Sequence, residues 1–215
     1  EIKGISDFCL KNGYQMNTHG IGDSAISIIL DVCKHAYQVK KDHRFRVEHA
    51  QVVNPNDFKK FADFAVFPSV QPTHAVSDCR WVEERIGQDR IRGAYAYKSL
   101  LNQFGMLAIG TDFPVEATNP FLTIHAAVKR KNKQNEPKNG FFIQEALTMD
   151  EVLKGMTIWA AFAEFNESKR GSLEKGKEAT LVICDKPVVA SDMFVENFAW
   201  KTFIKGRMVY QQGEL

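Results

Sequence analysis

The sequence has no closely spaced cysteine pair and no long apolar run. Its four cysteines, Cys9, Cys33, Cys79 and Cys184, lie far apart, and no Cys-x-x-Cys pair occurs. A disulfide framework or a structural zinc knuckle is therefore not expected, and the thiols are predicted to be buried packing groups. Every apolar run is shorter than the ~18 residues that a membrane-spanning helix needs, so we expect no membrane partner.

Neither sign of charge is in excess. The chain has 28 Lys and Arg residues against 26 Asp and Glu residues, and its formal net charge of +2 is too small to indicate a nucleic-acid partner. The most basic run, Lys129 to Lys133, is interpreted as the solvated end of a helix. The function classes that depend on strong charge are therefore not favoured.

The first residues include neither a methionine at the start nor a signal peptide. Glu1 stands in the middle of a helical pattern, so we expect that the natural protein has a preceding segment. The compartment stays open. Cysteine usage permits the cytoplasm, which is the default, and a preceding segment could carry an export signal.

What the chain does have is a regular alternation of short apolar runs and helical periodicity over its first two-thirds. This alternation indicates a parallel α/β sheet. Four such units do not close a barrel, because an eight-unit barrel needs about 250 residues. An open doubly wound sheet could be complete at this size, so both arrangements stay possible. The predicted strands are 14–18, 44–48, 64–70 and 106–110, and the predicted helices are 2–12, 23–39, one from Asn54-Pro55 onward, 77–86 and 95–104.

The last third changes character. Thr148 to Glu151 reads as a capping box that opens a helix ending near Phe165. Two further strands are predicted at 179–184 and 202–210, the second containing a turn at Lys205-Gly206. This part therefore resembles a small β appendage beside the main sheet.

Three metal-capable side chains stand at equivalent positions, where predicted strands end. His19 and His49 follow the first two strands, and Asp112 follows the fourth. Each alone is more simply explained as a structural residue. Together, two imidazoles and a carboxylate form a common ligand set for catalytic zinc, which keeps one position open for water. Chemistry in (β/α) barrels is placed at this rim, which favours half a barrel over a complete open sheet.

The motifs around these residues resemble one known family. The segments Asn17–Asp23 (NTHGIGD), Arg46–Gln51 (RVEHAQ), Ser69–His74 (SVQPTH) and Gly110–Val115 (GTDFPV) occur in the order seen in YtcJ-like proteins. Those proteins form the amidohydrolase family 3 branch of the amidohydrolase superfamily. The closing segment Gly171–Ala179 resembles the stretch that returns the chain to that family's small β-sandwich.

The resemblance implies a fold and a set of site residues. Residues 1–167 would form the C-terminal half of a (β/α)8 TIM-like barrel, and residues 168–215 part of the β-sandwich. His19, His49 and Asp112 would bind the metal, and Asp112 would also take a proton from the metal-bound water. Gln71 and His74 would face the substrate. The implied cofactor is a divalent metal, zinc first, with one or two ions left open.

One feature of the family is missing. Its members carry a His-x-His pair after their first strand and often a carboxylated lysine after the fourth, and neither match occurs here. The matching segments would lie before Glu1, so at most three of the usual five ligands are present. The missing N-terminal half of the same protein is therefore an expected partner.

The function implied is hydrolysis of an amide-like C–N bond of a small molecule through a metal-activated water. The alternative is a catalytically incomplete fragment, or a degenerate relative that lacks the N-terminal metal ligands. An unrelated α/β binding protein would require four ordered motifs to agree by accident. The substrate and the oligomeric state, including a homo-oligomer, are left open.

Overall fold

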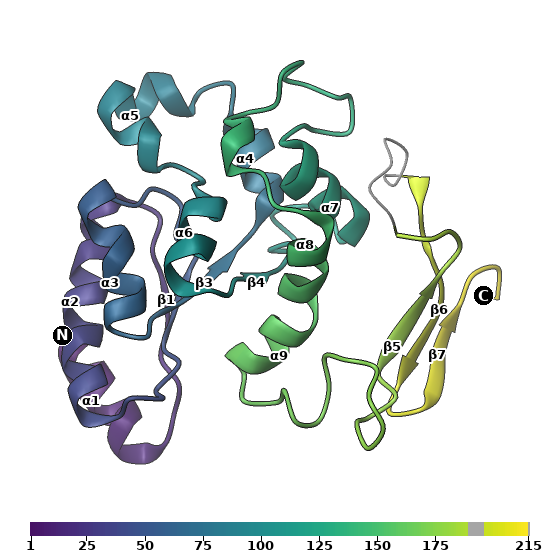
Figure 1. Cartoon of the computed structure of the whole chain (residues 1–215), viewed down its shortest axis with the longest axis horizontal. Helices are drawn as coiled ribbons and strands as arrows, with labels where there is room; N and C mark the ends of the chain where they lie inside the picture. Colours follow the sequence, from purple (N-terminus) through teal and green to yellow (C-terminus); the bar gives the residue numbers. More distant parts are fainter. Residues whose placement is uncertain (189–195, 215) are drawn as a thin grey trace.

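The computed structural model describes residues 1–188 and 196–214 and contains two separate sheets (Figure 1). The first is parallel with the strand order β1-β2-β3-β4, and the second is antiparallel with the order β5-β6-β7. In Figure 1 the second sheet stands apart from the first, on the far side of the last two helices. The strands are β1 (Asn17–His19), β2 (Arg46–Glu48), β3 (Phe67–Val70), β4 (Ala108–Ile109), β5 (Leu181–Cys184), β6 (Ala199–Ile204) and β7 (Arg207–Gln211).

Helices connect the successive strands of the parallel sheet. Neighbouring helices pack on one another as α1 with α2, α2 with α3, and α3 with α6. No helix in the described part of the chain combines the length and the apolar character needed to cross a membrane. The helices are α1 (Ile2–Asn12), α2 (Asp23–Val39), α3 (Phe58–Asp63), α4 (Pro72–Asp78), α5 (Val82–Arg90), α6 (Tyr97–Phe104), α7 (Pro120–Lys129), α8 (Met149–Met156) and α9 (Ile158–Ala163), with short 3₁₀ turns at Pro55–Asp57, Ile91–Gly93 and Ile143–Glu145.

The four parallel strands are hydrogen-bonded in chain order, without a reversal. The predicted parallel α/β sheet is confirmed. A doubly wound sheet has a switch point at which the strand order reverses, so the observed order favours a segment of a (β/α) barrel wall. That the segment belongs to a closed barrel stays a prediction.

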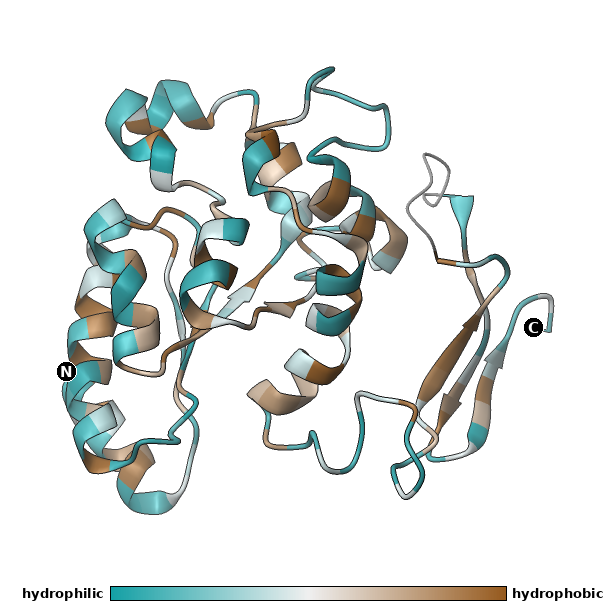
Figure 2. Ribbon diagram, in the orientation of Figure 1, coloured by the Kyte–Doolittle hydropathy of each residue, from teal (hydrophilic) through white to brown (hydrophobic). Residues whose placement is uncertain are grey.

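The two faces of the parallel sheet differ in polarity. Val47 and Val70 are fully buried on the face that the helices cover. On the opposite face Arg46 and Glu48 are half-buried, and their side chains form an ion pair of 2.9 Å. The helices turn a mixture of apolar and polar residues toward the viewer in Figure 2, as amphipathic helices do. The core beneath them includes Ile26, Leu30, Phe61 and Leu100, none with exposed surface.

Several sequence signals predict the elements closely. The helix predicted at 23–39 is α2 with the same bounds. Gly13 ends α1 with a φ of 73°, a left-handed conformation that favours glycine. The Thr148 hydroxyl and the Glu151 carboxylate form the predicted capping box at the start of α8. The turn predicted at Lys205-Gly206 joins β6 to β7, with φ angles of 51° and 80°.

Two helix predictions are wrong in their limits. The region of the helix predicted at 77–86 contains parts of two helices. Helix α4 begins earlier, with Pro72 in its first turn, and ends at Asp78, and α5 begins at Val82. The helix predicted to run to Phe165 is interrupted at Thr157, which has φ −127° and ψ −94°. The Thr157 hydroxyl there donates to the Leu153 carbonyl at 2.6 Å, a side-chain bond of the kind that competes with regular helix. The parallel strands are also shorter than predicted.

Candidate metal centre

The carboxyl edge of the parallel sheet gathers the polar side chains. The ladder continues one step past three strands, with bonds from the Gly20 amide to the Glu48 carbonyl (2.9 Å), from His49 to Ser69 (2.8 Å) and from Gly110 to Val70 (3.1 Å). This continuation aligns the ends of neighbouring strands. The residues that immediately follow the strands therefore meet at one edge.

The backbone at this edge adopts costly conformations. His49, Ala50 and Asp112 have positive φ angles of 75°, 44° and 61°. Such angles are uncommon for residues with a side chain, and they concentrate at functional sites. At His49 the turn follows directly on the end of β2 and sets the direction of the imidazole.

His19 and His49 form a direct pair. The Nδ1 atom of His19 lies 2.7 Å from the Nε2 atom of His49, and the rings stack with their centroids 4.8 Å apart. On its other side, His49 Nδ1 lies 2.9 Å from Oε1 of Gln71. An amide oxygen only accepts hydrogen bonds, so His49 carries its hydrogen on Nδ1 and its lone pair on Nε2. Gln71 thus leaves the nitrogen of His49 without a hydrogen, Nε2, facing His19.

Burial keeps His49 in the form that binds metals. The residue is 8% exposed, and burial lowers the pKa of its imidazole below the ordinary value of 6.5, with the Asp112 carboxylate opposing that shift. A lowered pKa keeps the ring neutral at neutral pH. Neutral imidazole is the metal-binding form.

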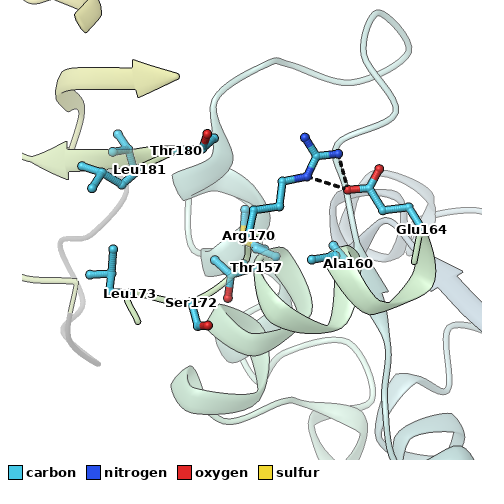
Figure 3. A pocket seen from close by; sticks show the side chains of 12 residues that line it. Thr157, Ala160, Glu164, Arg170, Ser172, Leu173, Thr180 and Leu181 are labelled. Carbon is cyan, nitrogen blue, oxygen red and sulfur yellow. Dashed lines mark hydrogen bonds and ion pairs between the residues drawn. The ribbon is translucent and has the colours of Figure 1, made fainter. Parts of the chain in front are cut away.

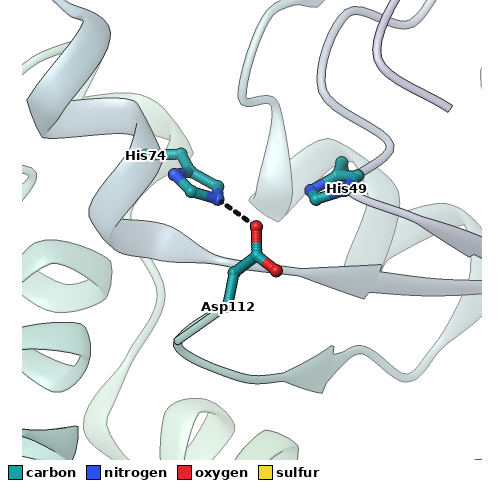
Figure 4. Close-up of side chains that lie close together, drawn as sticks. All are labelled: His49, His74 and Asp112. Atoms are coloured by element: carbon teal, nitrogen blue, oxygen red, sulfur yellow. Dashed lines mark hydrogen bonds and ion pairs between the residues drawn. The ribbon is translucent and has the colours of Figure 1, made fainter. Parts of the chain in front are cut away.

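His74 and Asp112 complete the cluster (Figure 4). His74, on α4, places Nε2 3.1 Å from Oδ2 of Asp112. One ligand atom each from His49, His74 and Asp112 lies within 4.8 Å of the other two, and the two imidazoles flank the Asp112 carboxylate in Figure 4. The side chains of His74 and Asp112 are 12% and 32% exposed. The cluster is therefore buried on one side and accessible at the carboxylate.

The donor set fits a divalent metal. Two ligands of one tetrahedral zinc, each at about 2.1 Å from the ion, stand about 3.4 Å apart. The His74–Asp112 contact, at 3.1 Å, is near that spacing, whereas the His19–His49 contact, at 2.7 Å, has the length of a direct hydrogen bond. The residues present are thus the kind of ligands that zinc accepts.

The five residues predicted from the sequence lie at this edge, but their contacts differ from their predicted roles. His19 contacts His49, while His74, predicted to face the substrate, joins His49 and Asp112 as a potential ligand. Gln71, also predicted to face the substrate, is 7% exposed and bonded to His49. The assignment of the metal ligands stays a prediction, with His74 added to it by the geometry.

Sequence reasoning missed one residue of the cluster. Glu116 accepts hydrogen bonds from Nδ1 of His74 at 3.3 Å and from the Ser77 hydroxyl at 2.7 Å. Its place in the sequence, directly after the Gly110–Val115 motif, could have marked Glu116 as a candidate site residue. Its contact depends on the turn after Asp112, which the sequence does not reveal.

A pocket elsewhere in the described part of the chain lacks the candidate metal ligands. It has a volume of about 370 Å³ and lies between α8–α9 and β5, with Thr157, Ala160 and Leu181 in its lining. Figure 3 shows the ion pair of Arg170 and Glu164, which also line this pocket. The Arg170 Nη2 and Glu164 Oε1 atoms of this pair are 2.6 Å apart. None of its lining residues is one of the predicted site residues.

The chain is similar to several known proteins. The model of the amidohydrolase family matches residues 5–210. Protein LONG AFTER FAR-RED 3 of Arabidopsis thaliana is 37% identical over 83% of this chain. Putative amidohydrolase YtcJ of Bacillus subtilis is 30% identical over 94%, and N-substituted formamide deformylase of Arthrobacter pascens is 26% identical over 99%. The chain spans only 31%, 38% and 39% of the lengths of these three relatives.

A solved structure is similar as well. An uncharacterized metal-dependent hydrolase from Pyrococcus horikoshii superposes with a TM-score of 0.75 and 30% sequence identity. The match covers 88% of this chain and 38% of that one.

Proposed function

The chain belongs to the amidohydrolase family, and on that premise we propose that it carries the metal centre of a hydrolase that cleaves amide-like C–N bonds. The observation that carries the proposal is the convergence of His49, His74 and Asp112 at the carboxyl edge of the sheet. Similarity to a protein named N-substituted formamide deformylase supports a C–N bond as the target. The substrate class is a small N-acyl or cyclic amide compound.

The metal is proposed to be zinc or a similar divalent cation. His49, His74 and Asp112 would hold it, with His19 as a further ligand through the nitrogen that faces His49. When bound, such a cation polarises a substrate carbonyl and lowers the pKa of a water molecule to about 7. Whether one or two ions bind depends on how these ligands are shared.

Asp112 is proposed as the proton carrier. Water adds its oxygen to the carbonyl carbon, and one water proton passes to the Asp112 carboxylate. That proton then moves to the amide nitrogen as the C–N bond breaks, so the products are a carboxylic acid and an amine. Asp112 suits this role because its side chain is 32% exposed, more than either imidazole of the cluster.

The protein around the centre is proposed to be a (β/α) barrel, with residues 1–167 contributing β1 to β4 to its wall. Residues 168–215 would belong to a small β-sandwich that includes β5 to β7. The remaining barrel strands, from the same protein, would be the partner of this segment. Sequential strand order supports this arrangement.

The test is turnover by the purified, zinc-loaded protein and its Asp112→Asn variant on a panel of N-substituted formamides and N-acyl amines. Amine release measures the reaction. The proposal predicts that the variant loses at least about 10²–10⁴-fold in kcat, the size of a general acid–base contribution. Equal rates in the two proteins would contradict the role of Asp112. Absence of both turnover and bound metal in the parent protein would support a degenerate relative instead.

A further inference from the structure

The loop between β4 and α7 is held against helix α4 directly after Asp112. The Asp112 carbonyl accepts a hydrogen bond from the Val115 amide at 2.8 Å, which closes a turn. At the end of this turn the Ser77 hydroxyl of α4 donates to the Glu116 carboxylate at 2.7 Å. Residues 112–116 are therefore fixed in place beside the candidate metal centre.

This turn leaves two large apolar side chains in contact with solvent. Phe113 and Val115, one on either side of Pro114, are 64% and 71% exposed. The backbone polar groups are satisfied within the loop, since the Phe113 amide donates to the Thr111 hydroxyl oxygen at 3.3 Å. Covering exposed apolar side chains with an apolar group is favourable, and such side chains gathered beside a site commonly contact its ligand. The turn thus offers an apolar contact surface next to Asp112.

The proposed reaction indicates which part of a substrate would meet this surface. In that reaction the Asp112 carboxyl group gives its proton to the amide nitrogen, so the two groups must come within hydrogen-bonding distance. The Cα atoms of neighbouring residues such as Asp112 and Phe113 are only about 3.8 Å apart. A substituent on the amide nitrogen therefore extends from the atom that is bonded to Asp112, within reach of the Phe113 ring.

We infer that Phe113, together with Val115, is a specificity-determining residue that contacts an apolar substituent on the nitrogen of the amide substrate. The inference rests on the proposed function and narrows its substrate class to amides with an alkyl or aryl group on nitrogen. Apolar contact of this kind binds the substrate and the transition state alike, so it acts mainly through KM. Each methylene group that it buries contributes about fourfold to binding.

The test compares kcat/KM over two series of amides, one lengthened by methylene groups on the nitrogen side and the other on the acyl side. In the parent protein each methylene on the nitrogen side should raise kcat/KM by up to about fourfold. Phe113→Ala should flatten this rise, mainly through KM, while Phe113→Leu should keep most of it. Neither variant should change the trend of the acyl series.

Phe8→Ala is the matched control. Phe8 is a similarly exposed phenylalanine, at 58%, and it stacks on Tyr14 ahead of strand β1, away from the carboxyl edge of the sheet. Its replacement should leave both series unchanged. Circular dichroism shows that each variant is folded.

Binding is also measured without turnover, through Phe113→Trp in chelator-treated protein. The emission of the new indole, after subtraction of the three tryptophans of the parent, should move to shorter wavelength when an N-butyl amide is added. The N-methyl amide of the same acid should cause a smaller shift. This measurement does not depend on catalysis.

Two results would overturn the inference while the proposed hydrolysis stands. One is a rise along the nitrogen series that Phe113→Ala leaves intact, and the other is an equal loss in the acyl series. A parent protein that hydrolyses no amide would overturn the proposed function itself. In that case the indole emission decides the inference, and an emission that the N-butyl amide leaves unchanged overturns it.

Discussion

The Nδ1 atom of His49 lies 2.9 Å from the Oε1 atom of Gln71, which stands just after the neighbouring strand β3. The Gln71 backbone is held in turn, because the Tyr97 hydroxyl donates to its carbonyl at 3.1 Å. Tyr97 is fully enclosed, at 1% exposed. The orientation of a candidate metal ligand is thus fixed by side chains of the core.

We therefore predict that Gln71→Leu weakens zinc binding about 10- to 100-fold, since the imidazole of His49 loses the partner that fixes its tautomer. The zinc dissociation constant measures the effect. Gln51→Leu is the matched control, because the Gln51 amide bonds to the Tyr95 hydroxyl at 2.7 Å and not to an imidazole. Equal affinities of the Gln71 variant and the parent would show that this bond has no role in metal binding.

The stability of the protein should fall as the pH drops below about 6.5, in part through His43. This residue is 2% exposed, its Nδ1 accepts from the Phe45 amide, and its Nε2 donates to the Phe64 carbonyl. Burial lowers the pKa of His43 below 6.5. Below that pH the unfolded chain binds a proton that the native state resists, so acid favours unfolding. Above it the ring is neutral in both states, and the effect vanishes.

The measurement is the free energy of unfolding in urea at pH 7.5 and at pH 5.5, for the parent and for His43→Gln. The parent should lose more stability between the two pH values than the variant does. The same loss in both proteins would assign the pH dependence to other groups.

Gly93 should not tolerate a side chain. A Cβ atom there would lie 1.8 Å from the Val53 carbonyl oxygen, and the Val53 amide donates to the Gly93 carbonyl at 2.9 Å. Because backbone blocks the space, Gly93→Ala should cost about 3 kcal/mol or more of unfolding free energy. Gly4→Ala, in α1 with open space around it, should instead stabilise by about 0.5–1 kcal/mol. Chemical denaturation of the two variants compares them, and similar stabilities would contradict the packing described at Gly93.

Sequence patterns predict the parts of this fold that depend on local chemistry. Helix α2 has an uninterrupted apolar stripe, and its predicted bounds agree with the structure. The break at Thr157 was not predicted, because apolar periodicity continues across it. The predicted strands also extend too far, because Tyr14 and Gln15 lie outside β1, which begins at Asn17.

The sequence predicts which residues form the site better than it predicts the contacts between their side chains. His19, His49 and Asp112 follow strands, and parallel strands bring their carboxyl ends to one edge, so their proximity follows from order along the chain. The partners of His74 and Gln71 depend instead on helix rotation and on the turn after Asp112. Those are tertiary features, which is why Glu116 was missed.

The central claim, that His49, His74 and Asp112 hold a divalent cation, is tested most directly by metal content. The purified protein is stripped with a chelator, reloaded with zinc, desalted and analysed by mass spectrometry for zinc per chain. The parent should retain stoichiometric zinc, and the His49→Ala/His74→Ala double variant, shown to be folded by circular dichroism, should lose it. Zinc retention that is equal in the two proteins, or absent from both, would contradict the claim.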